Sequence, residues 1–206
     1  MKKTALNLPN TLSLIRCLLV PVFVAALIFM RDMGIWGIIV PALVYGLTAL
    51  TDMLDGKIAR KYNLITDFGK FIDPLADKFM VFASCITLLV IDSATAHIFV
   101  WVSAAVMLRE LAVTSLRLVV AGQSGIVVAA SFFGKCKTVT QVVAITFMLL
   151  EPVFLHLSAK MGITALASFF EAHILSYISM AAMAITTVAS GIDYLKSYFP
   201  YIDTNK

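Results

Sequence analysis

The sequence predicts an all-α integral membrane protein with six transmembrane helices. Of its 206 residues, 61% are hydrophobic and only 14% are charged, a balance outside the range of globular domains in water. Six apolar runs are each about 20 residues long, which is the length that a helix needs to cross a bilayer. Because they leave almost nothing for a soluble domain, we expect residues 1–206 to form one transmembrane domain. The runs are residues 12–30, 34–54, 71–91, 97–120, 138–157 and 174–192.

The first run follows Lys2 and Lys3, an arrangement that secretory signal peptides share. The run is longer than the apolar core of such peptides, and no small-x-small cleavage site follows Met30. We therefore expect a retained first helix, entered through a short interfacial segment around Pro9 and kinked or locally loosened at Pro21.

Polar residues and glycines mark the connections between the later runs. We expect tight turns at 31–34 and 92–96, and a polar segment, 52–70, that joins the second and third runs. The stretch AGQSGIVVAASFFGKCKT, residues 121–138, is too broken to cross twice, so we expect a loop or an interfacial helix there. The last connection, 160–173, contains the apolar stretch ITALASFF, which is suited to the membrane interface.

Lys and Arg residues set the expected orientation. With a cytoplasmic amino terminus, six crossings place most positive charges on the cytoplasmic side, as the positive-inside rule requires, and leave Arg31 and Lys160 in outward loops. Both termini are then cytoplasmic. The net charge of +4 suits a protein that faces anionic lipid, and it needs no nucleic-acid partner. The histidines then lie at outward ends, and the cysteines have no spacing that suggests a disulfide or a thiolate metal site.

Five aspartates between Thr51 and Phe79 interrupt this apolar sequence. Asp67 fits no common helix face and is expected to cap a helix or lie in a loop. Helical angles sort the other four into two faces, which can meet at the cytoplasmic end because the second and third helices are consecutive and antiparallel. The first face carries Asp52, Asp55, Gly56, Ala59 and Arg60, and the second carries Gly69, Asp73 and Asp77.

Four carboxylates in one place repel one another unless cations are present. A ligand set made only of carboxylates favours Mg²⁺ or Mn²⁺ over zinc, so we expect a metal site with two ions. Such ions suit phosphoryl transfer, in which one aspartate can serve as the base. Arg60 is suited to bind phosphate, and the small residues leave room for a ligand beside the helices. The alternative is a solvated loop in which nearby lysines pair with the aspartates.

The order Asp52-x-x-Asp55-Gly56-x-x-Ala59-Arg60, then eight residues, Gly69, three residues, Asp73, three residues and Asp77 resembles the full signature of the CDP-alcohol phosphatidyltransferases. The resemblance implies a homodimer of six-helix subunits and one catalytic domain, residues 1–206. It implies transfer of a phosphatidyl group from a CDP-linked lipid to an alcohol, with release of CMP. Asp52, Asp55 and Asp73 would be metal ligands, and Asp77 would be the base and also contact a metal. The CDP-lipid would contact Asp52, Gly56, Ala59, Arg60 and Gly69.

Other stretches are similar to bacterial phosphatidylglycerophosphate synthases, among them NLPNTLSLIRCLLVPVF, DPLADKFM, LRELAVTSLR and GKCKT. This similarity implies CDP-diacylglycerol as donor, glycerol 3-phosphate as acceptor and the bacterial cytoplasmic (inner) membrane as location. Arg117, Lys135 and Lys137 have no obvious acidic partner in the sequence, so we expect them to bind the acceptor phosphate. Ordinary positive-inside anchoring is the alternative for these three residues.

Arg109 and Glu110 lie within the fourth run, where an unpaired charge is costly, so we expect an ion pair.

Other acceptors stay open: phosphatidylglycerol would make the protein a cardiolipin synthase, and serine or inositol phosphate would give other products. A divalent-cation transporter is a different class. It would need acidic residues along a route to the outside, whereas the aspartates gather at one end. A purely structural membrane subunit would leave the two aspartate faces unexplained.

Overall fold

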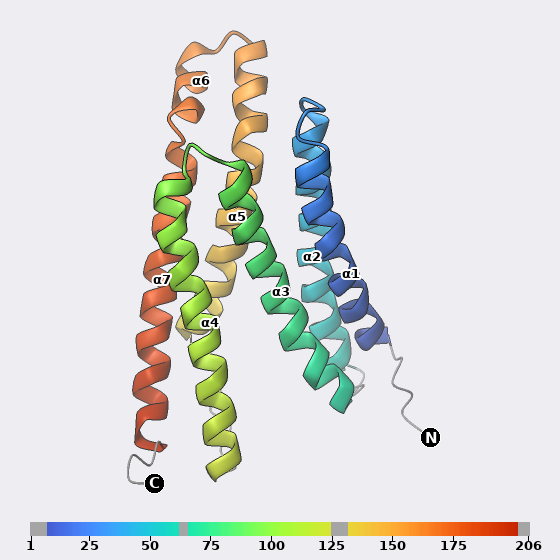
Figure 1. Ribbon diagram of the computed structural model, residues 1–206, viewed down its shortest axis with the longest axis vertical. Coiled ribbons are helices and arrows are strands. Elements are labelled where there is room, and N and C mark those ends of the chain that lie inside the picture. The colour runs from blue at the N-terminus through green and yellow to red at the C-terminus, as the bar shows by residue number, and fades with distance from the viewer. Residues whose placement is uncertain (1–7, 62–65, 125–131, 202–206) are drawn as a thin grey trace.

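In the described part of the chain, seven α-helices run up and down along one long axis and a 3₁₀ turn follows them (Figure 1). The computed structural model describes residues 8–61, 66–124 and 132–201, but not the side chains of 8, 9, 52–61, 67, 70, 121, 123 and 124. We call the end at which α1 begins and α7 ends the terminal end, and the other the opposite end (Figure 1). The elements are α1 (Leu8–Phe29), α2 (Trp36–Lys61), α3 (Asp67–Ile91), α4 (Ala96–Ser124), α5 (Phe132–Lys160), α6 (Thr164–Glu171), α7 (Ile174–Tyr198) and the 3₁₀ turn (Phe199–Tyr201).

Five of the helices so described are long and apolar enough to cross a membrane, judged by length and composition. The predicted span 34–54 falls on α2, whose described apolar part, Trp36–Thr51, is too short to be counted with them. An all-helical membrane protein is therefore confirmed, whereas the number of spans stands at five of the expected six. The five are Asn10–Phe29, Phe71–Ile91, Ala96–Val120, Phe132–Lys160 and Ile174–Tyr201.

The outer surface of the bundle is apolar, unlike the surface of a protein in water. Leu18, Trp101 and Leu118 expose 71%, 77% and 71% of their surface. So much exposed hydrocarbon requires a lipid environment or a partner. Because lipid tails are as apolar as these side chains, burial of hydrocarbon does little to hold the helices together, and close packing and polar contacts become decisive.

Two connections are shorter than the sequence predicts. α2 continues to Lys61 and α3 begins at Asp67, so most of the expected polar connection, 52–70, is helical. α5 begins at Phe132, so residues 132–138 of the expected loop or interfacial helix are helical and continuous with the next span, while residues 125–131 lie outside the described part of the chain. An apolar run marks the thickness of the bilayer. The helix itself continues beyond that limit because residues such as Lys, Arg, Ala and Leu favour helical backbone in water as well.

Thr66 is the N-cap of α3, since its side-chain oxygen accepts the Gly69 N–H at 3.0 Å. Asp67 is the first residue of the helix. The expectation that Asp67 caps a helix or lies in a loop is therefore wrong. The preceding hydroxyl already satisfies an N–H group of the first turn, and the helix begins directly after it.

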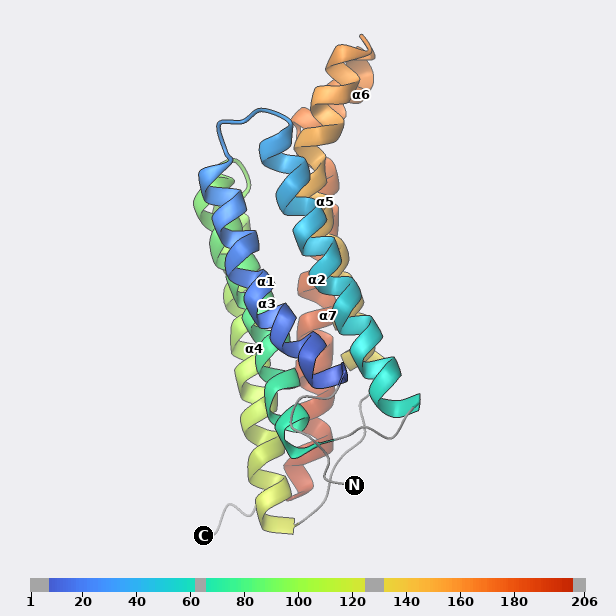
Figure 2. The same ribbon diagram turned by 90° about the vertical axis from the view of Figure 1, so that its right-hand side faces the viewer.

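One face of α1 is buried against α2 and α3 (Figure 2). Its buried side chains recur every three or four residues, which is the spacing of a single helix face. The apolar half of the face joins the main core, where the rings of Phe23 and Tyr45 lie 5.5 Å apart. From the terminal end, the buried residues are Asn10, Ser13 and Arg16, followed by Val20, Phe23 and Leu27.

The polar half of this face fastens the start of α3. Asn10 Nδ2 donates to Thr66 Oγ1 at 2.8 Å, and Ser13 Oγ donates to Asp73 Oδ1 at 2.5 Å. Gly69 lies against Asn10, because a Cβ at this position would be 2.6 Å from Asn10 Oδ1. Only glycine allows α1 and α3 to approach this closely. We call these five residues, Asn10, Ser13, Thr66, Gly69 and Asp73, the α1–α3 seam.

At the opposite end, a buried carboxylate caps α7. Glu151 of α5 is 1% exposed; it accepts the Leu175 N–H at 3.1 Å and the Ser176 hydroxyl. Both donors belong to the first turn of α7, where N–H groups lack partners within the helix. His173 precedes the helix with a φ of 52°, and its Nδ1 lies 3.5 Å from Glu151 Oε2. Glu151 therefore ties α7 to α5, while α6 projects beyond α1 and α2 (Figure 1).

Gly69→Ala is expected to destabilise the protein by about 1–3 kcal/mol, because the added methyl group must displace Asn10 from the α1–α3 seam. Thermal unfolding of the purified protein in detergent micelles measures this effect. Gly122→Ala in α4 is the matched control, since no atom lies within 4 Å of its added Cβ, and it should be neutral or slightly stabilising. Equal melting temperatures for the two variants would contradict a tight seam.

Candidate active site

Two of the predicted site residues lie on α3, where the α1–α3 seam holds the helix. Asp73 is exposed, and Asp77, one turn farther along, is half-buried. Ser13 donates to one oxygen of Asp73, and the second oxygen has no partner among the described residues. A carboxylate that is oriented through one oxygen and open at the other is suited to bind a cation.

The first predicted face lies in the last turns of α2. The helix is unbroken through this segment and α3 begins soon after it, so the helical spacing used for both faces is confirmed. Both segments lie at the terminal end (Figure 1). Among the described residues, which include Asp73 and Asp77, no group of three or more His, Cys, Asp or Glu side chains could hold a metal ion. The structure does not describe the side chains of Asp52, Asp55, Gly56, Ala59 and Arg60.

A buried cluster of charged side chains joins three other helices. Glu110 Oε1 lies 3.2 Å from Arg109 Nη1 and forms a second ion pair with Lys137 Nζ. The three side chains are between 6% and 10% exposed. Arg109 Nη2 also donates to Ser190 Oγ at 2.5 Å. The expected Arg109–Glu110 ion pair is thus present, and Lys137 is its third member. We call Arg109, Glu110 and Lys137 the charge cluster; it links α4 to α5 and α7.

The residues predicted to bind the acceptor phosphate have different surroundings. Lys137 is buried and paired with Glu110, so the expectation that it has no acidic partner is wrong. The two residues are 27 positions apart, and their contact depends on how α4 packs beside α5. Arg117 is exposed, and it donates through Nη2 to the hydroxyl of the buried Tyr194 at 2.5 Å. Lys135 lies on the surface.

Ser190 and Tyr194 of α7 are absent from the set predicted from sequence, although they contact Arg109 and Arg117. One signal could have indicated them. The buried face of α7 carries hydroxyl groups at helical spacing within an apolar span, and in a membrane such a face predicts contacts to polar groups of a neighbouring helix. These groups are Ser176, Ser179, Thr187, Ser190, Tyr194 and Tyr198.

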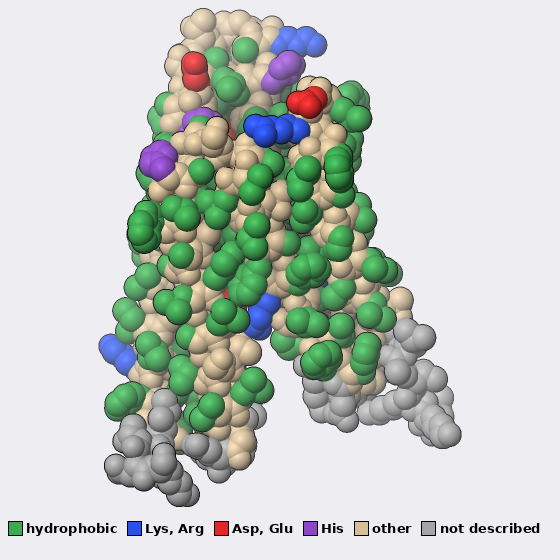
Figure 3. Space-filling view, in the orientation of Figure 1, with side chains coloured by type: hydrophobic (Ala, Val, Ile, Leu, Met, Phe, Trp, Pro, Cys, Tyr) green, Lys and Arg blue, Asp and Glu red, His purple; other side chains and the backbone are tan. Residues whose placement is uncertain are grey.

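The terminal end of the bundle is hollowed. Figure 3 shows two limbs that diverge toward this end, with positively charged side chains at the top of the hollow between them. Lys78, the residue after Asp77, lies close enough to Glu110 for an electrostatic interaction. Asp77 of α3 and Glu110 of α4 are the same number of residues away from the turn that joins these helices. They therefore lie at a similar depth along the bundle. The charge cluster and the second aspartate face therefore border the same region.

Residues 6–192 match the family model of the CDP-alcohol phosphatidyltransferases. The chain belongs to this family. The match covers the complete signature between Asp52 and Asp77 and extends over most of the helical bundle. The family predicted from the spacing of the aspartates is thereby confirmed.

Bacterial relatives are similar over most of the chain. The "CDP-diacylglycerol–glycerol-3-phosphate 3-phosphatidyltransferase" of Bacillus subtilis is 42% identical over 154 residues, 70% of this chain and 77% of that protein. The "Probable phosphatidylglycerophosphate synthase" of Mycobacterium tuberculosis is 35% identical over 92% of this chain and 80% of that protein. The Escherichia coli K12 protein with the same name as the Bacillus one is 35% identical over 84% of this chain and 91% of its own length.

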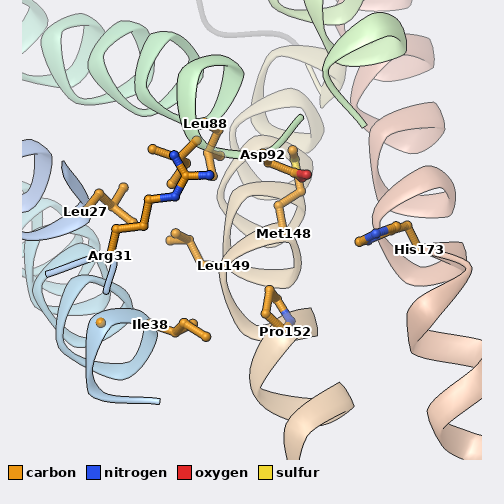
Figure 4. A pocket seen from close by; sticks show the side chains of 11 residues that line it. Leu27, Arg31, Ile38, Leu88, Asp92, Met148, Leu149, Pro152 and His173 are labelled. Carbon is orange, nitrogen blue, oxygen red and sulfur yellow. The ribbon is translucent and has the colours of Figure 1, made fainter. Parts of the chain in front are cut away.

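A cavity lies at the opposite end of this CDP-alcohol phosphatidyltransferase. Its volume is about 170 Å³, and Arg31, Asp92 and His173 line it together with apolar residues such as Met148 and Pro152 (Figure 4). None of its lining residues belongs to the family signature. The cavity is therefore separate from the region in which the aspartates and the charge cluster lie.

Glu110→Gln is expected to destabilise the protein by about 3 kcal/mol, because it leaves Arg109 and Lys137 buried without a carboxylate. Thermal unfolding in micelles checks this, with Glu171→Gln on the exposed surface of α6 as the control. Combining Glu110→Gln with Lys137→Met removes one uncompensated charge and should recover part of the loss. If the double variant unfolds at the same or a lower temperature than Glu110→Gln, the ion pair is not what holds α5 to α4.

Proposed function

We propose that the protein transfers the phosphatidyl group of CDP-diacylglycerol to sn-glycerol 3-phosphate, giving phosphatidylglycerophosphate and CMP. The observation that carries the proposal is the complete family signature, which begins in α2 and ends in α3. The names of relatives that are 35–42% identical support both substrates. The positive charge of Arg109, Arg117 and Lys137 on α4 and α5, which exceeds that of their partner Glu110, supports an acceptor that carries a phosphate.

We further propose that four aspartates, Asp52, Asp55, Asp73 and Asp77, hold two divalent ions, Mg²⁺ or Mn²⁺. Members of the family generally depend on a metal. The proposed donor set consists only of carboxylates, and Asp73 offers an open oxygen while Ser13 orients the other, which supports binding of such ions. When bound, the ions would neutralise phosphate oxygens of the donor.

The proposed reaction is a direct displacement. The acceptor hydroxyl forms a bond to the lipid-side phosphorus of CDP-diacylglycerol, Asp77 takes the hydroxyl proton, and the bond between that phosphorus and CMP breaks. CMP leaves with the electron pair of that bond. The half-buried position of Asp77 on α3 suits a group that must reach both the hydrophobic donor and the water-soluble acceptor.

The CDP-lipid is proposed to contact the first aspartate face and Gly69. At Gly69 the α1–α3 seam supplies a packing reason for glycine, since Asn10 takes the space beside it. A contact between Gly69 and the donor would therefore involve its backbone. The full proposed set is Asp52, Gly56, Ala59, Arg60 and Gly69.

Arg117, Lys135 and Lys137 are proposed to bind the acceptor phosphate. Glu110 is the carboxylate that pairs with both Arg109 and Lys137, while Arg117 has a neutral phenol as its partner. Positive charge is therefore in excess among these described groups. A phosphate monoester carries about 1.5–2 negative charges at neutral pH and would compensate this excess.

The membrane arrangement is part of the proposal. We propose one catalytic domain, residues 1–206, with six spans in a homodimer, and both termini on the cytoplasmic side of the bacterial inner membrane. α1 begins and α7 ends at the same end, as this orientation requires (Figure 1). The signature segments lie at that end too, where a soluble acceptor from the cytoplasm can reach them.

The first test is CMP release by the purified protein from CDP-diacylglycerol with a panel of acceptors. We expect release with glycerol 3-phosphate and Mg²⁺ or Mn²⁺, loss of release with EDTA, and recovery when the metal is restored. The other arms contain phosphatidylglycerol, serine and inositol phosphate. Faster release with one of these would replace the proposed acceptor, and no release in any arm would contradict transferase activity.

Asp77→Asn is expected to lower kcat by at least about 100-fold, because an amide does not accept the hydroxyl proton as a carboxylate does. The measurement is the initial rate of CMP release at saturating substrates. Asp92→Asn at the other end of α3 is the control, since Asp92 contacts Thr95 and lies outside the signature. Full turnover by Asp77→Asn would exclude it as the base.

A further inference from the structure

We propose that Tyr194 of α7 is a positioning residue for the acceptor phosphate, which holds the guanidinium groups of Arg109 and Arg117 as a pair without neutralising their charge. The inference rests on the proposed function, because the acceptor phosphate is the ligand for which the pair is held. It adds α7, which carries no part of the family signature, to the acceptor site.

Tyr194 contacts both arginines of α4. The Cζ atoms of Arg109 and Arg117 lie 5.1 Å and 4.8 Å from the centre of its ring, distances at which a cation is attracted to an aromatic ring. Its hydroxyl accepts from Arg117 Nη2 at 2.5 Å. The arginines are about two helical turns apart, and one rigid ring contacts both of them.

The ring itself is held firmly. Tyr194 is 2% exposed and stacks on Tyr198 with 6.1 Å between the ring centres. Both rings belong to a small core with Val113 and Val120 of α4, separate from the main core. Because this core fixes the ring, the ring can fix the long and otherwise mobile side chain of Arg117.

The partners of the arginines on α7 are uncharged. Arg109 donates to the Ser190 hydroxyl and Arg117 to the Tyr194 hydroxyl. Glu110 of α4 already pairs with Arg109, whereas a carboxylate in place of Tyr194 would bind Arg117 more strongly but would cancel its positive charge. A guanidinium has five N–H donors, and Arg117 has no further partner among the described residues, so its remaining donors are available to a ligand.

The pair lies at the depth where the acceptor must react. Counted from the turn between α3 and α4, Arg109 is level with Lys78 and Arg117 is level with Lys70. The depths of Asp73 and Asp77 therefore fall between those of the two arginines. A phosphate held by the pair would keep the rest of a small acceptor at the depth of the proposed base.

The alternative is that Tyr194 only packs α7 against α4. The two interpretations predict different kinetics for Tyr194→Phe, which keeps the ring and removes the hydroxyl. A positioning role predicts that the KM for glycerol 3-phosphate rises about tenfold to 100-fold, which corresponds to the loss of one hydrogen bond to a charged group, while the KM for CDP-diacylglycerol stays constant. A packing role predicts a lower melting temperature and no selective change in either KM.

Tyr198→Phe is the matched control, since it makes the same chemical change in the neighbouring stacked ring and should leave both KM values unchanged. The decisive measurement is a double-mutant cycle with Arg117→Ala. Because Tyr194 is proposed to act through Arg117, adding Tyr194→Phe to Arg117→Ala should raise the KM for glycerol 3-phosphate no further.

If the wild type is active and Tyr194→Phe leaves the KM for glycerol 3-phosphate unchanged, the inference about Tyr194 is overturned while the proposed function stands. The same holds if the two substitutions raise that KM independently, or if both substrates lose affinity equally. A wild type that releases no CMP with glycerol 3-phosphate would overturn the proposed function and this inference with it. The wild-type rate therefore separates the two failures.

Discussion

The ion pairs of Glu110 constrain how α4, α5 and α7 pack together. An isolated charge within the membrane is costly, so Arg109, Glu110 and Lys137 must meet, and they can do so only in one register of α4 against α5. Arg109 then reaches Ser190, which brings α7 into the same register. Apolar contacts could not specify this arrangement alone, because lipid offers the same side chains an equivalent environment. The contacts that neutralise buried charge therefore also place the hydroxyl groups of α7.

α1 shows how one helix face can serve both packing and chemistry. Its apolar half completes the main core, whereas its polar half orients Asp73 through Ser13 and contacts Gly69 through Asn10. Gly69 belongs to the family signature, and the structure gives it a reason in helix packing. A signature can thus contain residues that hold the reacting groups in place as well as the groups themselves, and the support of Asp73 lies outside the signature, in the first helix.

The sequence was sufficient to predict the all-helical membrane class and the family, since both depend on composition and on spacing within two neighbouring segments. It did not predict where α5 begins, because an apolar run indicates the thickness of the bilayer and not the full length of the helix. It also missed the pairing of Glu110 with Lys137 and the contacts of Ser190 and Tyr194. Those depend on which helices lie side by side and in which register, and hydrophobic periodicity within a single helix carries no information on either.

The charges around Arg117 bear on the choice of acceptor. Serine has no net charge, and phosphatidylglycerol carries one negative charge on a diester, so neither would compensate the excess of positive charge as a phosphate monoester does. Inositol phosphate would do so equally well, which means that charge selects the phosphate group and not the alcohol. Discrimination between glycerol and inositol must then come from the space left for the hydroxyl-bearing part, at the depth of Asp73 and Asp77. In the proposed function, acceptor recognition is therefore divided between two regions: the α4–α7 side would bind the phosphate, and the aspartate faces of α2 and α3 would limit the size of the alcohol.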